Sequence, residues 1–241
     1  MNLARRSFIR AAGACAATAA LPGSIVAALA QDKLRPGAKD ALIVVDVQRC
    51  FLPGGSLAVA GGDEIVPLVN GFAKRFRNVI VTQDWHTPGH ISFASVHPDK
   101  KPFETVQLPY GTQVLWPDHC VQGTEGADLA PGLSIPHAQL VIRKGYNEKV
   151  DSYSAFLEAD RKTRTGLDGY LKARGITKVY VCGLATDFCV AWTALDARKL
   201  GFGAVVVEDL CRGIDAQGSL AKAWTAMQAA GVKRAQSGDF A

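Results

Sequence analysis

The stretch KVYVCGLATDFCVAWTALDARKLG (Lys178–Gly201) joins a β-rich apolar run to a segment with helical patterning. Its first part, Lys178–Ala185, predicts a strand, and Phe188–Leu200 predicts a helix that is ended by Gly201. A turn of small residues and an acid separate the two, and Cys189 lies where the helix begins. A strand that passes directly into a helix indicates a βα unit, and therefore a parallel sheet.

The same alternation runs along most of the chain. Four further apolar runs predict strands: Ala41–Gln48, Asn78–His86, Ala138–Gly145 and Gly203–Leu210. Because all five runs are continuously apolar, we expect strands that are covered on both faces. Further helices are expected at Asp63–Phe76, Thr165–Ala173 and Ser219–Ala230, the last ended by Gly231. The pattern predicts an α/β fold, a three-layer sandwich with a mostly parallel central sheet.

One connection is too long to be a plain loop. The stretch Thr87–Ser134 is rich in Pro, Gly, Asp and His, and we expect it to be irregular. Loops of this length inside a compact domain are commonly functional.

The first thirty residues have the features of a targeting segment. Arg5 and Arg6 precede Phe8 and Ile9, and an uncharged, alanine-rich stretch then ends in the small-x-small sequence 28–30. This resembles a twin-arginine export signal, which predicts export by the twin-arginine machinery and a periplasmic protein. An uncleaved anchor or a wrongly assigned start remains open, although the apolar run is short for a membrane span. We expect a signal at 1–30, a linker at 31–40 and one domain at 41–241.

Composition and charge exclude few function classes. The chain is 48% hydrophobic and 20% charged, which is ordinary for a globular protein, and its net charge of +5 includes charges of the signal. Charge therefore indicates no nucleic-acid or membrane partner. Of the six cysteines, five remain if Cys15 leaves with the signal, so at least one is unpaired unless two chains are bridged. Disulfides among the others and a homo-oligomer both stay open.

Reactive side chains follow the ends of the predicted strands. Asp46 lies at the end of the first strand, Asp84 and His86 at the end of the second, and Lys144 at the end of the third. Cys189 follows the fourth strand. Because the carboxyl ends of parallel strands share one edge, where ligands bind, we expect these side chains to form a single site.

Cys189 has two interpretations. A cysteine is more often a small buried hydrophobe than a nucleophile, which is how we interpret Cys182 inside its strand. At a helix N-terminus, however, the dipole favours a thiolate, and Lys144 would add to that effect. Lys144 should face inward, because Arg143 beside it on the strand points to the opposite side.

The Asp84-Trp85-His86 segment raises the question of a metal. Residues at i and i+2 of a strand point to the same side, so Asp84 and His86 can hold one ion, and His119 in WPDHCVQGT offers a third ligand. An Asp/His set suits a divalent ion such as zinc, iron or manganese. His90 is a weaker fourth candidate, and His97 and His137 fit solvated loop histidines better.

Five motifs in order carry a resemblance to a known family. VVDVQ, DWH…HISFAS, WPDHCVQGTEGA, RKG…DSYSAF and GLATDFCVAWTALDA, spread between Ala41 and Gly213, resemble the nicotinamidases of the isochorismatase-like cysteine hydrolase superfamily. The resemblance implies the isochorismatase-like hydrolase fold. It also implies a catalytic set of Asp46, Lys144 and Cys189. The metal ligands that it implies, Asp84, His86 and His119, separate nicotinamidases from metal-free relatives that act on isochorismate or carbamoyl compounds.

The resemblance further implies the reaction. Nicotinamide would be hydrolysed to nicotinate and ammonia through a Cys189 thioester, as a step of NAD salvage, and pyrazinamide would be a side substrate. The amides of Ala185 and Cys189 would form the oxyanion hole, with a cis bond between Leu184 and Ala185. The family's aromatic pocket positions match Phe51, Trp116 and Tyr153. Hydrolysis of another small amide, or a non-catalytic periplasmic nicotinamide-binding protein, remain the alternatives.

Overall fold

Six parallel strands form the central sheet of the protein. The computed structural model describes residues 33–241, so the expected export signal at 1–30 lies outside the described residues. The strand order is β5-β2-β1-β6-β7-β8, and every neighbouring pair is parallel. The strands are β1 (Asp40–Val45), β2 (Asn78–Asp84), β5 (Leu140–Lys144), β6 (Lys178–Leu184), β7 (Gly203–Arg212) and β8 (Lys233–Ala235). The predicted mostly parallel sheet is confirmed.

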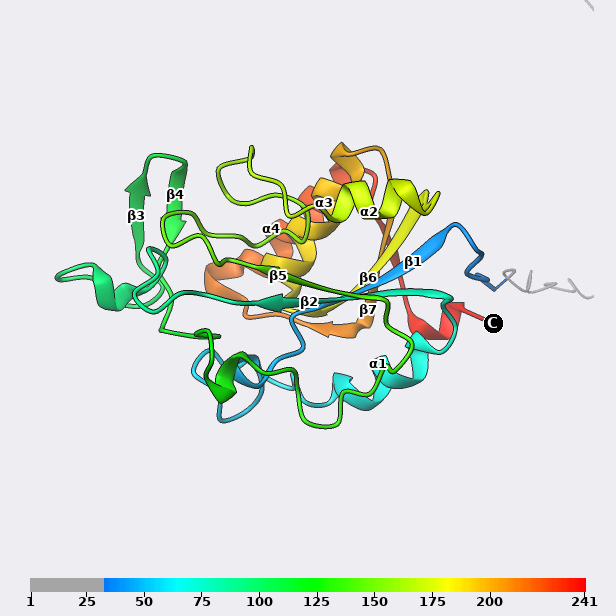
Figure 1. Cartoon of the computed structure of the whole chain (residues 1–241), viewed down its shortest axis with the longest axis horizontal. Coiled ribbons are helices and arrows are strands. Elements are labelled where there is room, and N and C mark those ends of the chain that lie inside the picture. Colours follow the sequence, from blue (N-terminus) through cyan, green and yellow to red (C-terminus); the bar gives the residue numbers. More distant parts are fainter. Residues whose placement is uncertain (1–32) are drawn as a thin grey trace, which may run out of the picture. The chain divides into compact units, whose positions relative to one another are not determined.

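Helices cover both faces of this sheet. Figure 1 shows α1 (Ile65–Ala73) on one side, and α2 (Leu167–Ala173) and α3 (Ala191–Lys199) on the other. Helix α4 (Ser219–Ala229) packs against α3. Gly201 and Gly231, at φ +91° and +75°, follow α3 and α4 as predicted, because glycine adopts this left-handed conformation readily. Within residues 33–241, every helix is too short or too polar to span a bilayer.

Burial of the strands matches the prediction in the centre of the sheet and differs at its edge. All seven residues of β2 are buried, as expected for a central parallel strand. In β5, which lies at the edge, Val141 and Arg143 are exposed while Lys144 is buried. Cover on both faces was therefore a wrong prediction for β5. The opposite orientations of Arg143 and Lys144 are confirmed.

Two pieces of secondary structure were not predicted. The segment 87–134, expected to be irregular, contains the antiparallel hairpin of β3 (Thr105–Leu108) and β4 (Gly111–Val114). Strand β8 has only three residues, of which Lys233 and Arg234 are exposed. Such short, polar strands lack the apolar run by which the others were recognised.

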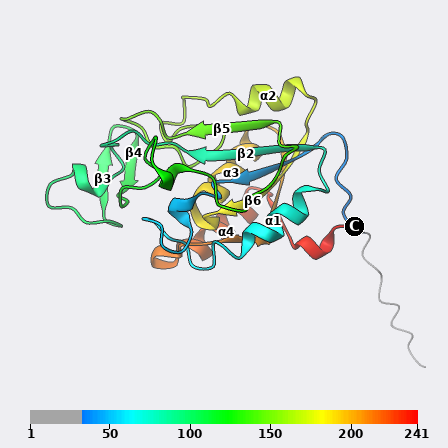
Figure 2. The same cartoon turned by 60° about the horizontal axis from the view of Figure 1, so that its bottom comes forward.

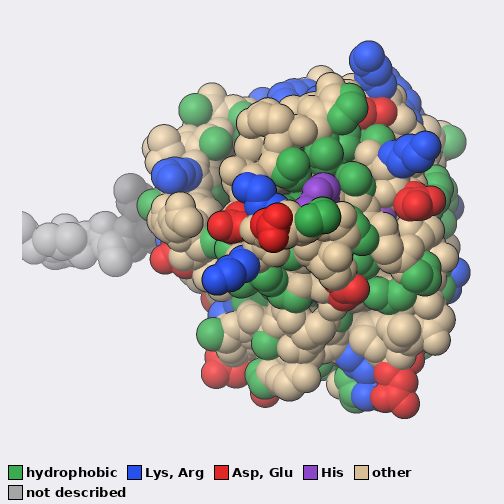
Figure 3. Space-filling view, turned by 90° about the vertical axis from the view of Figure 1, so that its left-hand side faces the viewer, with side chains coloured by type: hydrophobic (Ala, Val, Ile, Leu, Met, Phe, Trp, Pro, Cys, Tyr) green, Lys and Arg blue, Asp and Glu red, His purple; other side chains and the backbone are tan. Residues whose placement is uncertain are grey.

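The order of the strands creates a crevice. β1 and β6 are neighbours, but the chain continues from β1 to β2 on one side and from β6 to β7 on the other. At such a switch point the connections leave in opposite directions, and ligands bind beyond the carboxyl ends of the strands. Figure 2 shows the arrowheads of β2 and β5 pointing towards the β3–β4 hairpin. Figure 3 views the molecule from the hairpin side, where basic and acidic side chains are interspersed.

Candidate active site

Asp46, Lys144 and Cys189 meet in this crevice. The Lys144 Nζ lies 2.8 Å from Oδ2 of Asp46 and 3.3 Å from Sγ of Cys189. All three residues are buried. They reach this point from the ends of β1 and β5 and from the segment after β6. The structure thus brings together the three residues that the resemblance implied as a catalytic set, although their roles stay a prediction.

Lys144 connects this group to a second one. Its Nζ donates hydrogen bonds to Oδ1 of Asp84 at 2.6 Å and to the carbonyl oxygen of Ser152 at 2.9 Å. Burial opposes a charge on Lys144, but Asp46 and Asp84 hold its pKa well above the usual value. The ammonium group is therefore permanently charged and fixes the separation of two carboxylates.

Asp46 has one fully engaged oxygen and one that is largely free. The Thr82 hydroxyl donates to Oδ1 at 2.5 Å, and the same hydroxyl accepts the Asp46 N–H at 3.0 Å. Oδ2 has the ion pair with Lys144 but accepts no well-aligned hydrogen bond from any residue in 33–241. Burial raises the pKa of Asp46, and Asp84 adds to this effect against Lys144. A carboxylate with a raised pKa and one oxygen that accepts no well-aligned hydrogen bond suits proton exchange.

Cys189 lies in a π-helical turn, Thr186–Val190, that precedes α3. Burial raises its pKa well above the usual value, and the charges of Asp46 and Asp84 counter the lowering effect of Lys144. The sequence predicted a thiolate from the helix N-terminus and Lys144. Lys144 favours the thiolate as predicted, but burial and the two carboxylates act in the opposite direction. The thiolate therefore stays a prediction.

The turn before Cys189 has the backbone that the resemblance implied. The peptide bond between Leu184 and Ala185 is cis. Ala185 and Cys189 both line the pocket described below. The function of their amides as oxyanion donors stays a prediction.

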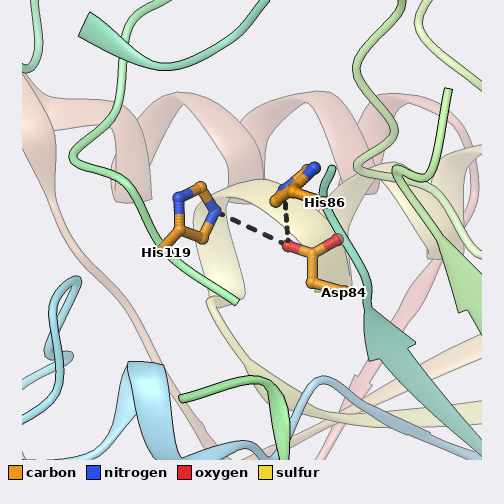
Figure 4. A group of neighbouring side chains, drawn as sticks. All are labelled: Asp84, His86 and His119. Atoms are coloured by element: carbon orange, nitrogen blue, oxygen red, sulfur yellow. Dashed lines mark ion pairs between the residues drawn. The ribbon is translucent and has the colours of Figure 1, made fainter. Parts of the chain in front are cut away.

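Asp84, His86 and His119 converge beside this group (Figure 4). Oδ2 of Asp84 lies 3.5 Å from Nε2 of His86 and 3.7 Å from Nε2 of His119. Each histidine uses Nδ1 for a backbone carbonyl, that of Gly145 at 2.9 Å and that of Pro117 at 2.8 Å. A Cβ on Gly145 would lie 2.5 Å from the His86 ring, so only glycine fits there. Anchored Nδ1 atoms and convergent Nε2 atoms are typical of metal-binding histidines.

The other histidines are occupied. His90 is buried, with Nδ1 2.7 Å from the Ser92 hydroxyl and Nε2 2.9 Å from the Asn147 carbonyl oxygen. Burial lowers the pKa of His90 to about 4, so its ring is neutral. His90 lies close enough to His86 and Asp151 for the three to hold an ion together, so its assignment as a ligand stays open. His97 and His137 each hydrogen-bond to a backbone carbonyl away from the site.

The charges of the site fit a divalent cation. Asp151 is 2% exposed and accepts hydrogen bonds from Gln113 Nε2 at 2.7 Å and from the Ser152 amide at 2.8 Å. Lys144 pairs with Asp46 and Asp84, and Asp151 adds a third buried carboxylate beside His86, so the acidic groups outnumber the lysine at this site. Buried charges are normally paired or bound to metal, and a dication would balance this excess. The donor set of one carboxylate and two imidazoles suits zinc, iron or manganese.

A pocket of about 320 Å³ of empty space opens onto both groups. The three aromatic residues expected from the resemblance, Phe51, Trp116 and Tyr153, line it. The Trp116 indole N–H donates to the Tyr153 hydroxyl at 3.0 Å, which fixes the two rings. The remaining lining residues are Leu57, Asp84, His86, His119, Asp151, Ala185, Phe188, Cys189 and Ile214. Its mostly apolar walls, with several aromatic rings, suit a small aromatic molecule.

Comparison with known proteins places this site in a family. Residues 40–237 match the isochorismatase domain model. The chain belongs to the isochorismatase family. The family prediction made from the five motifs is therefore confirmed.

Relatives in the isochorismatase family include nicotinamidases. The chain is 61% identical over 197 residues to the nicotinamidase of Acinetobacter baylyi, which covers 82% of this chain and 92% of the relative. The solved nicotinamidase and pyrazinamidase of Acinetobacter baumanii has a TM-score of 0.84 and 62% identity, covering 84% and 98% of the two chains. The Pyrococcus horikoshii pyrazinamidase, solved in complex with zinc, has a TM-score of 0.68 and 35% identity, covering 82% and 99%. The isochorismatase-like fold is confirmed.

Four pocket residues of this isochorismatase-family chain were not predicted. Asp151 lies in the DSYSAF motif and Phe188 directly before Cys189, but neither was given a function. Ile214 comes two residues after β7, so the rule that located the other site residues could have found it. Leu57, in the segment between β1 and α1, had no such signal.

The structure assigns the five cysteines within residues 33–241. Cys50 and Cys120 form a disulfide, with Cα atoms 5.6 Å apart. Cys182, Cys189 and Cys211 are free and buried. The interpretation of Cys182 as a core residue is confirmed, because it is fully buried inside β6.

Proposed function

We propose that the protein hydrolyses nicotinamide to nicotinate and ammonia through a thioester on Cys189, with a metal-assisted substrate site. One observation carries this proposal: the Cys189 thiol and the Asp84, His86 and His119 cluster line the same small pocket. Substrate and nucleophile would thus be held together. The names of the relatives support nicotinamide as substrate and pyrazinamide as a second one.

The site residues support a two-step mechanism. The substrate ring lies between the aromatic walls, with its carboxamide carbon next to Sγ of Cys189. Asp46 Oδ2 takes the thiol proton as sulfur attacks, and gives it to the departing ammonia. The amides of Ala185 and Cys189 stabilise the oxyanion. Asp46 then takes a proton from water, which attacks the thioester and releases nicotinate and the thiol.

The metal site contributes binding and orientation. Asp84, His86 and His119 would hold the ion, and the zinc complex of the P. horikoshii pyrazinamidase supports this assignment. When bound, a divalent ion supplies Lewis acidity and a fixed charge that orients the substrate. Lys144 then keeps Asp84 ionised: although burial opposes it, the pKa of Asp84 lies well below its usual value.

Ammonia release by the purified protein tests the substrate. We expect turnover of nicotinamide and pyrazinamide, and little turnover of isochorismate or of an N-carbamoyl compound. If the metal-loaded protein released no ammonia from nicotinamide but hydrolysed another amide, the substrate assignment would be wrong.

Removal of the metal should lower the activity. A strong chelator followed by gel filtration is expected to reduce kcat/KM for nicotinamide by about 10- to 100-fold, because the substrate loses its orienting charge. Addition of zinc, iron(II) or manganese should restore it, with metal content measured in parallel. Protein treated with calcium-saturated chelator is the control. Full activity in verified metal-free protein would contradict the metal-assisted site.

Thr82→Val should move the acidic limb of the pH profile of kcat/KM to higher pH. Asp46 must be ionised to accept the thiol proton, so activity falls as the pH drops through its pKa. The Thr82 hydroxyl stabilises the ionised form, and its loss raises that pKa further. Thr193→Val is the matched control, since this buried hydroxyl accepts a hydrogen bond from the Ala155 amide rather than contacting Asp46. An unshifted limb in Thr82→Val would argue against Asp46 as the base.

We also propose that residues 1–30 direct export, so that the enzyme converts periplasmic nicotinamide for NAD salvage. The Cys50–Cys120 disulfide supports this proposal, because disulfides persist in oxidising compartments. Fractionation of the source cells should find the mature chain, beginning near Gln31, in the periplasm. A chain found only in the cytoplasm, with residues 1–30 retained, would refute export.

A further inference from the structure

The Cys50–Cys120 disulfide joins two walls of the pocket. Cys50 is followed by Phe51 and Cys120 is preceded by His119, and both of these neighbours line the pocket. Their rings are in contact, with centroids 5.6 Å apart. The bond therefore links the segment after β1, which also carries Asp46, to the loop that supplies a metal ligand.

We propose that this disulfide positions His119, so that the affinity for the metal depends on the Cys50–Cys120 bond. The inference rests on the metal-assisted site of the proposed function. It concerns two residues outside the ligand set and outside the proposed catalytic set.

Backbone hydrogen bonds hold the His119 loop on both sides. Before His119, the Trp116 N–H donates to the Ser92 carbonyl oxygen at 2.8 Å, and the Trp116 carbonyl oxygen accepts the Ala94 N–H at 2.8 Å. The carbonyl oxygen of Cys120 accepts the His86 N–H at 3.1 Å, and the Gln122 N–H donates to the His86 carbonyl oxygen at 2.8 Å. These bonds attach the chain after His119 to the extension of β2. Further along, the Arg49 N–H donates to the Asp128 carbonyl oxygen at 3.0 Å, and the disulfide adds a covalent link to the Phe51 segment directly beside His119.

Cys120 has an unusual backbone conformation, which the disulfide helps to hold. Cys120 has φ +45°, a left-handed conformation that residues other than glycine rarely adopt, so its surroundings must hold it there. Cys120 is bonded directly to His119, so the conformation held at Cys120 also restricts the backbone that carries this imidazole. In the structure Nε2 of His119 lies 3.7 Å from Asp84 Oδ2.

A purely structural staple makes a different prediction. A disulfide that closes a loop of 70 residues stabilises a fold mainly by restricting the unfolded chain, and this effect does not depend on the metal. Breaking such a disulfide would lower the thermal midpoint equally in metal-free and metal-loaded protein. A positioning disulfide would also weaken metal binding to the folded protein.

The test compares zinc and cobalt(II) affinities of the metal-free full chain in its oxidised and reduced forms. Two equivalents of an external thiol reduce the bond, giving two cysteine thiols and one external disulfide, and are removed anaerobically before titration. Oxidised glutathione, which takes up the two electrons and two protons, then restores the bond. Dissociation constants come from competition with a chromophoric chelator, and thiol counts verify each state.

We expect reduction to weaken metal binding by about 10- to 100-fold, the range for loss of a group that orients a ligand. Reoxidation should restore the affinity, which separates the effect from misfolding. Cys50→Ser should bind like the reduced chain and stay insensitive to thiol. Cys211→Ser is the matched control, because serine can keep the hydrogen bond from this buried thiol to Val207.

Equal or tighter binding in the reduced chain and in Cys50→Ser would overturn the inference alone and leave the proposed function standing. Failure of the oxidised chain to bind either ion would overturn the metal-assisted site and the inference with it. A thiol count that shows no disulfide in the oxidised chain would also overturn the inference.

Discussion

Cys189→Ala is expected to reduce ammonia release from nicotinamide by about 10⁴-fold or more, since loss of a nucleophile removes the covalent route entirely. The folded structure should persist, because the substitution deletes one buried sulfur atom that also lines the pocket. Circular dichroism and the thermal midpoint check the fold, and a coupled ammonia assay checks the rate. Metal affinity should be unchanged, since Cys189 is outside the ligand set.

Cys182→Ala is the matched control for this prediction. Cys182 is also a buried, free cysteine, but it lies inside β6 and away from Lys144. Its activity should stay near that of the unmodified protein. If Cys189→Ala kept its ammonia release, or if the two variants lost activity equally, Cys189 would not be the nucleophile. If the unmodified protein bound nicotinamide but did not hydrolyse it, a binding protein would be favoured instead.

Lys144→Met is expected to lower the free energy of unfolding by about 3–5 kcal/mol and to abolish activity. The substitution leaves the buried carboxylates of Asp46 and Asp84 without their shared cation, which is strongly destabilising. Both carboxylates would then have pKa values above those of the unfolded chain. The variant's deficit should therefore be largest near neutral pH and shrink as the pH falls and the carboxylates take up protons.

Urea denaturation of metal-free protein at several pH values measures this effect. Arg143→Met is the control, because Arg143 is the exposed neighbour on β5 and its guanidinium lies 3.8 Å from the centre of the Trp85 ring. We expect it to change stability by only about 1 kcal/mol. If Lys144→Met were too unstable to purify, Lys144→Arg would retain the charge and separate stability from catalysis. Equal stability losses in Lys144→Met and Arg143→Met would contradict the buried ion-pair network.

Most of the site could be located from the sequence, because the carboxyl ends of parallel strands meet at one edge of the sheet. Asp46, Asp84, Lys144 and Cys189 are up to 143 positions apart, yet each lies near the carboxyl end of a predicted strand or shortly after it. Parallel pairing brings these ends together without any knowledge of side-chain packing. The direction of Lys144 followed equally from the alternation of side chains along a strand.

Features that depend on side-chain packing or on the combined charges around a residue could not be predicted from the sequence. The pKa of the Cys189 thiol depends on burial, on Lys144 and on two carboxylates, and only the three-dimensional structure shows that all of these act on it together. The pairing of Cys50 with Cys120 requires the distance between their backbones. Asp151 is a single acid among many until its burial shows it to be part of the site.

The most direct measurement is mass spectrometry of protein that is acid-quenched during turnover of nicotinamide labelled with ¹³C in the carboxamide. Acid traps a thioester, and digestion then locates it. The proposed mechanism predicts a labelled nicotinoyl group on the peptide that contains Cys189, and none on the same peptide of Cys189→Ala. Label on another residue, or continued ammonia release by Cys189→Ala, would contradict it.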